Sequence, residues 1–139
     1  MENNGQRFVV YRSLAHPEWF ELRLTMDGMM KCWRVRNGIP VDIQTRRIAV
    51  EEPPGPPSGK EPPGRATASP RSQGPAYPWD AGVWYSIGHA DGYRLGHLKF
   101  CLRGLLLHGE WALVRMSDQG GVIRPPWLLL LISPSHAQV

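Results

Sequence analysis

The dipeptide Asp27-Gly28 lies between two runs of alternating apolar and polar residues, and it limits how this part of the chain can fold. A two-residue hairpin loop of type I′ needs positive φ at both of its positions, which glycine adopts freely and aspartate tolerates. The flanking runs, Trp19–Met26 and Met29–Arg36, are therefore predicted to be paired antiparallel strands. We expect a chain that is rich in β-structure.

Pairing outward from this turn divides the hairpin into an apolar side and a polar side, because residues two apart along a strand share a side. The apolar side is made by the cross-strand pairs Leu22–Trp33 and Phe20–Val35. The polar side holds three arginines and one carboxylate, in the pairs Trp19–Arg36, Glu21–Arg34 and Arg23–Cys32. Such an arginine cluster suits a phosphate. An ordinary ion pair between Glu21 and Arg34, worth about 0.2–1 kcal/mol, is the alternative.

Further short strands are predicted along the chain, with glycines in the turns between them. They are Arg7–Tyr11, Ile43–Val50, Gly82–Ser86, Leu98–Leu102, Glu110–Met116 and Trp127–Ile132. Many short strands separated by glycine turns are typical of a barrel or a sandwich. We therefore predict an all-β fold, a small antiparallel β-barrel, with no helix longer than two turns.

A segment rich in proline and glycine interrupts this pattern over residues 51–78, EEPPGPPSGKEPPGRATASPRSQGPAYP. Proline cannot donate to a strand ladder, and the segment has almost no apolar residues to bury. We predict a disordered loop or linker inside a single domain that spans residues 1–139. Its proline runs also allow short polyproline II stretches, which some partner domains recognise.

Composition limits the class of protein further. The 139 residues amount to about one domain, and the net charge of +4 is compatible with a nucleic-acid partner or with an ordinary solubilising surface. Cys32 and Cys101 form no zinc motif. The N-terminus lacks an apolar signal region, and the longest apolar run, Trp127–Ile132, is too short to span a bilayer. We expect a cytoplasmic protein with no membrane partner.

Several blocks of sequence bear on the family of this chain. They are RFVVYRSLAHPEWFELRLTMDGMMKCWRVRNGIP from Arg7, RRIAV from Arg46, WDAGVW from Trp79, LKFCLRGLLLHGEWALVRM from Leu98 and WLLL from Trp127. Together they resemble the 3′-phosphoesterase domain of bacterial DNA ligase D. The resemblance implies a small β-barrel whose core includes Trp33, Trp79, Trp84, Trp111 and Trp127. It also implies manganese-dependent removal of 3′-phosphates and terminal ribonucleotides from DNA before ligation in end joining.

The residues at the family's metal-binding positions differ from the family's motif. The resemblance places the two histidine ligands on Ser13 and Trp19 and the aspartate on Glu21, and it keeps an arginine at Arg23. An indole only donates a hydrogen bond, and a serine hydroxyl is a weak ligand. Glu21 alone does not make a metal site, and His16 is the histidine closest in sequence that could swing in.

The second half of the family's site is also altered. Arg47 matches the arginine that contacts phosphate, but no histidine or tyrosine follows between Ile48 and Ala76, where the resemblance implies a general acid and a phosphate-binding tyrosine. Our first hypothesis is a degenerate homologue without catalysis or a cofactor. It would bind phosphate or DNA ends through Arg23, Arg34, Arg36 and Arg47, with end-joining proteins as further partners.

Two other hypotheses stay open. The first is an active divalent-metal phosphoesterase, with manganese held by a site rebuilt around Glu21. The second is a protein-interaction module, in which the barrel is a scaffold and the proline-rich segment or the side that carries Trp19 binds a partner.

Overall fold

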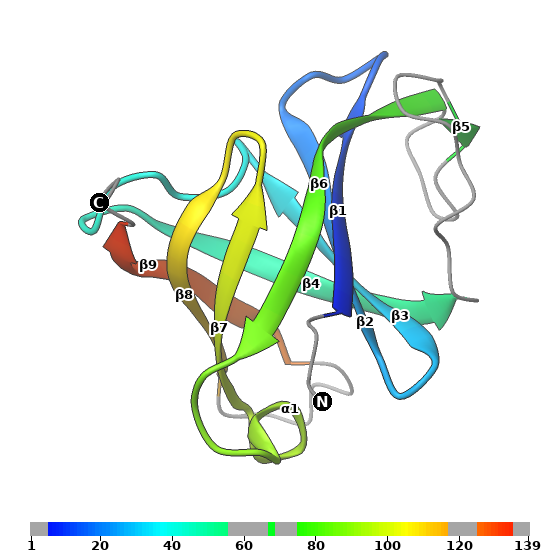
Figure 1. The fold of residues 1–139 in the computed structure, drawn as a ribbon. Coiled ribbons are helices and arrows are strands. Elements are labelled where there is room, and N and C mark those ends of the chain that lie inside the picture. The colour runs from blue at the N-terminus through cyan, green and yellow to red at the C-terminus, as the bar shows by residue number, and fades with distance from the viewer. Residues whose placement is uncertain (1–5, 56–66, 69–74, 117–124, 135–139) are drawn as a thin grey trace.

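The computed structural model describes residues 6–55, 67–68, 75–116 and 125–134, and most of them lie in β-strands (Figure 1). The strands are β1 (Gln6–Ser13), β2 (Trp19–Met26), β3 (Met29–Arg36), β4 (Arg46–Gly55), β5 (Thr67–Ala68), β6 (Pro75–Ser86), β7 (His97–Gly104), β8 (His108–Arg115) and β9 (Trp127–Pro134). A single short helix, α1 (Gly92–Leu95), lies among the described residues.

The strands close into an antiparallel barrel, which confirms the predicted fold class. Their order is β1-β2-β3-β4-β9-β8-β7-β6, and β1 also pairs with β6, so eight strands complete the ring and only β5 lies outside it. Figure 1 shows α1 at one end of this barrel, between β6 and β7. In the described part of the chain, no helix has the length and apolar character that crossing a membrane requires.

The central hairpin has the predicted turn and register. Asp27 and Gly28 have φ values of 55° and 77°, as a type I′ turn requires. The pairs Leu22–Trp33 and Glu21–Arg34 lie opposite each other in β2 and β3, as do the other predicted pairs.

Tryptophan fills much of the barrel interior. Trp33, Trp84, Trp111 and Trp127 are at most 4% exposed and belong to the buried core cluster, while Trp79 packs against it. The rings of Trp33 and Trp127 meet edge to face with their centroids 5.7 Å apart. These five positions are the ones that the sequence placed in the core.

The prediction that residues 51–78 form only a loop is wrong at both ends. β4 continues through Pro53 and Pro54 to Gly55, and β6 begins at Pro75. In the described structure β4 pairs with β9 only from Arg46 to Ala49, so its later residues have a strand partner on one side alone. Proline lacks an N–H donor and is tolerated on such an edge. Residues 56–66 and 69–74 lie outside the described part.

A buried carboxylate holds the turn between β7 and β8. Asp80 is 4% exposed and accepts hydrogen bonds from the backbone N–H groups of Leu105 (2.8 Å), Leu106 (3.1 Å) and Leu107 (2.9 Å). A Cβ atom at Gly104 would lie 2.3 Å from Asp80 Oδ2, so the turn needs glycine at this position. Asp80 thereby joins β6 to the β7–β8 turn.

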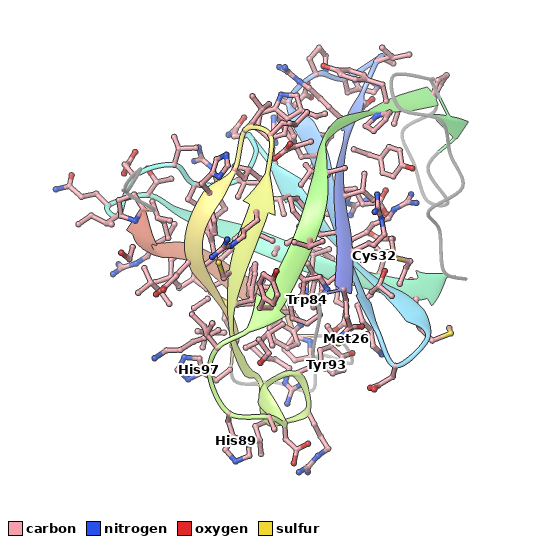
Figure 2. The ribbon with its side chains drawn as sticks, viewed as in Figure 1. Met26, Cys32, Trp84, His89, Tyr93 and His97 are labelled. Carbon is pink, nitrogen blue, oxygen red and sulfur yellow. The ribbon has the colours of Figure 1, made fainter. Side chains whose placement is uncertain are left out.

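A second carboxylate fixes β4 where its pairing with β9 ends. Glu51 accepts a hydrogen bond from the hydroxyl of Tyr93 and another, of 3.1 Å, from Nε1 of Trp127. The rings of Tyr93 and Trp127 are stacked, with centroids 5.7 Å apart, and the Lys31 ammonium lies 4.5 Å from the Tyr93 ring centroid. Figure 2 shows Tyr93 towards the end of the barrel where α1 lies.

Substitution of Asp80 tests the first of these carboxylates. Asp80→Asn replaces one acceptor oxygen by an NH₂ group that faces backbone donors, and we expect a loss of about 2–3 kcal/mol in the free energy of unfolding. Urea denaturation measures this loss. Asp27→Asn in the exposed hairpin turn is the control, because asparagine also tolerates positive φ there. Equal midpoints for the two variants would contradict this role of Asp80.

The contact between Tyr93 and Glu51 predicts a loss of stability at alkaline pH. Burial and the hydrogen bond to Glu51 raise the pKa of Tyr93 above its ordinary value of 10.0. Above pH 10 the phenol therefore stays neutral in the folded protein, whereas it ionises in the unfolded chain. The free energy by which Tyr93 stabilises the folded protein is thus fully present below pH 10 and is lost as the pH rises above that value. In urea denaturation, the stability advantage of the native chain over Tyr93→Phe should shrink above pH 10, whereas parallel pH profiles would contradict this.

Candidate functional site

The polar side of the hairpin lies on the outside of the barrel. Leu22 and Leu24 of β2 point into the core, so their neighbours Glu21 and Arg23 point outward, although these two residues are only 6% and 7% exposed. We call this surface the polar face. It consists of the outward side chains of β1, β2, β3 and the second half of β4: Tyr11, Ser13, Trp19, Glu21, Arg23, Cys32, Arg34, Arg36 and Glu52.

The ion pairs on the polar face differ from the predicted one. Glu21 Oε1 lies 3.1 Å from Arg23 Nη2 on the same strand, and both side chains are 8% exposed. Arg34 turns instead towards β4, where its Nε lies 3.5 Å from Oε2 of Glu52. The expected ion pair between Glu21 and Arg34 is therefore replaced by two others. The sequence did not reveal the role of Glu52, because that residue was assigned to a loop.

Two arginine donors on the polar face are shielded from solvent and form no hydrogen bond with any described residue. They are the Nε–H groups of Arg23 and Arg34, on neighbouring strands. The third such donor in the described structure, Nε1 of Trp33, belongs to a core residue. The Arg23 guanidinium also lies 4.3 Å from the ring centroid of Tyr11. The sequence predicted Tyr11 only as a residue of the first strand. Because its neighbour Val10 points into the core, the side chain of Tyr11 faces outward. An anion at this face could accept from both Nε–H groups.

Trp19 stands at the edge of the polar face with arginines beside it. The guanidinium carbons of Arg34 and Arg36 lie 5.2 Å and 5.6 Å from its ring centroid. Arg36 is the residue directly opposite Trp19 in the hairpin register. Cation–π contacts therefore hold these two arginines against the indole.

Ser13 and His16 organise the loop between β1 and β2. The Ser13 hydroxyl accepts a hydrogen bond of 3.0 Å from the backbone N–H of His16, whose carbonyl accepts one of 2.9 Å from the N–H of Trp19. The His16 side chain is exposed. Figure 2 places His89 and His97 towards the end of the barrel that carries α1, away from Cys32 on the polar face.

Arg47 lies on the other side of the sheet. It shares a side of β4 with Ala49, which is fully buried in the core, and its Nε donates a 3.3 Å hydrogen bond to the carbonyl of Gly38. The structure thus brings Arg23, Arg34 and Arg36 together on the polar face and keeps Arg47 apart from them.

The residues at the positions that the resemblance assigns to the metal do not fit a manganese ion. The Ser13 hydroxyl accepts from a backbone N–H group, the indole of Trp19 cannot ligate, and Glu21 is paired with Arg23. Cys32 is buried, and its thiol donates a hydrogen bond of 3.6 Å to the carbonyl of Met30. Within the described ranges, no three His, Cys, Asp or Glu residues are grouped as metal ligands.

A double-mutant cycle tests the buried ion pair of the polar face. Glu21→Leu leaves the Arg23 guanidinium buried without this carboxylate, and we expect a loss of about 3 kcal/mol in the free energy of unfolding. The double variant Glu21→Leu/Arg23→Met removes both charges and should lose much less than the two single losses together. Urea denaturation of the four proteins gives the coupling energy. Additive single effects would show that the pair contributes no coupling.

Comparison of the sequence with known protein families and proteins identifies the family of this chain. Residues 13–115 match the family model described as the DNA ligase D 3′-phosphoesterase domain. The chain is also 29% identical over 133 residues, 95% of its length, to the multifunctional non-homologous end joining protein LigD of Pseudomonas aeruginosa. It spans only 16% of the length of that relative. The chain belongs to the family of DNA ligase D 3′-phosphoesterase domains.

Proposed function

We propose that this chain binds a phosphorylated nucleic-acid end on its polar face and does not hydrolyse it with a metal ion. The observation that carries the proposal is the pair of shielded Nε–H donors of Arg23 and Arg34, neither of which makes a hydrogen bond within the part of the chain that the structure describes. A phosphate oxygen would supply that acceptor, and guanidinium groups are well suited to phosphate.

The charges of the polar face support the same proposal. Among the described residues of this face, three arginines, Arg23, Arg34 and Arg36, stand against two carboxylates, Glu21 and Glu52, which leaves one positive charge in excess. The 3.1 Å contact between Glu21 and Arg23 positions a guanidinium that is almost fully buried. The looser 3.5 Å contact between Arg34 and Glu52 leaves Arg34 able to turn towards an anion.

The relative and the family suggest which phosphate this is. The Pseudomonas aeruginosa relative is named as a non-homologous end joining protein, and the family model is named for a 3′-phosphoesterase. We therefore take the ligand to be a DNA end with a 3′-phosphate, met during DNA repair by end joining. This role agrees with the cytoplasmic location expected from the sequence.

The loss of hydrolysis rests on the substitutions at the family's metal positions. Ser13, Trp19 and Glu21 stand where the resemblance implies two histidines and an aspartate, and the contacts of these residues serve a turn, an arginine stack and an ion pair. A chain of this kind is a pseudoenzyme that would bind phosphate through the arginines of its polar face.

Binding assays test the proposed ligand. A DNA oligonucleotide with a 3′-phosphate should bind more tightly than its 3′-hydroxyl counterpart, and Arg34→Gln should weaken that binding about tenfold. Fluorescence anisotropy at two salt concentrations measures affinity, which should fall steeply as salt rises. Arg12→Gln is a control of equal charge, because Arg12 lies on Phe20 and donates to the carbonyl of Pro17, away from the polar face.

Two results would overturn the proposal. An absence of DNA binding at low salt would leave the protein-interaction module as the better hypothesis. Manganese-dependent release of phosphate from the 3′-phosphorylated oligonucleotide, abolished by Glu21→Ala, would show an active phosphoesterase with a rebuilt site.

A further inference from the structure

We infer that Trp19 is a platform on which an unpaired base of the bound nucleic acid stacks, next to the phosphate held by Arg34. The inference rests on the proposed function and adds what the phosphate contacts alone do not specify. It makes the preferred ligand an end whose last nucleotide is single-stranded.

Trp19 differs in its surroundings from every other tryptophan of the chain. The sequence has six tryptophans, and the five others belong to the core cluster or pack against it. Trp19 is half-buried, belongs to the polar face and has Arg34 and Arg36 over its ring, and it is not among the described residues that form the core cluster or pack against it. A large aromatic ring among charged side chains contributes little to the core. A base that takes the place of the Arg36 guanidinium would stack on its π-surface.

The two arginines place a phosphate site beside this ring. The Arg34 guanidinium carbon lies 5.2 Å from the indole centroid, and Nε of the same guanidinium is one of the two shielded donors without an acceptor. Arg36 is exposed and lies 5.6 Å from the same centroid, so it can move aside without loss of a buried contact. A nucleotide presents a flat base and a phosphate close together, which is the arrangement that Trp19 and Arg34 offer.

The stacking surface favours an unpaired base. A base in a duplex already stacks on its neighbours, whereas a base in a single strand offers its π-face to an aromatic side chain whatever its identity. The polar face is therefore suited to a single-stranded end, and it should discriminate little between the four bases.

The test compares two 3′-phosphorylated DNA oligonucleotides that differ only in the terminal nucleotide of a single-stranded overhang, which is either thymidine or abasic. The native chain should bind the thymidine end about 5–100-fold more tightly, the range expected for one stacked base. Trp19→Phe should retain most of this ratio. Trp19→Leu, which keeps apolar bulk but has no π-face, should reduce the ratio to about one.

The Leu variant separates stacking from space-filling. If Trp19 only fills space, Trp19→Leu keeps the native ratio, and that result overturns the inference. Equal affinity of the native chain for the two ends overturns it as well, while the proposed phosphate binding stands. Failure of both ends to bind at low salt overturns the proposed function itself. Urea denaturation of each variant establishes that the proteins compared are folded.

Discussion

The pairing of β1 with both β2 and β6 is the constraint on which the rest of this structure depends. It closes the sheet, so every side chain of the ring lies either in a dry interior or on the outer surface. The interior is filled by tryptophan, phenylalanine and leucine side chains. Because β2 lies beside β1 in the ring, Phe20 and Leu22 face inward, and the intervening Glu21 must face outward.

The same alternation gives two adjacent glutamates of β4 different roles. Glu51 points to the interior and accepts hydrogen bonds from Tyr93 and Trp127, where the pairing of β4 with β9 has ended. Glu52 points outward and contacts Arg34 on the polar face. The interior contacts of Glu51 thus hold the part of β4 that places Glu52 beside Arg34, and they connect the end of the barrel near α1 to the candidate site.

The turn and the register of the hairpin could be predicted because their evidence is local. A turn that needs positive φ and an alternation of period two fix the register without reference to other strands. The course of β4 could not be predicted, since Pro53 is acceptable in a strand only when one edge lacks a partner, and that depends on where β9 ends. The register of β4 also decides which side of the sheet Arg47 occupies, and it places Glu52 beside Arg34.

The shielded donors of Arg23 and Arg34 also bear on how the polar face is stabilised. A buried donor without an acceptor lowers the stability of the folded protein by about 1–3 kcal/mol. A buried guanidinium avoids this loss when it donates to a carboxylate of the protein or to a bound anion. Here Glu21 and Glu52 lie within ion-pair distance, yet neither Nε–H donates to them. A bound anion would supply the acceptor that both donors lack, so the proposed phosphate binding would also stabilise the polar face.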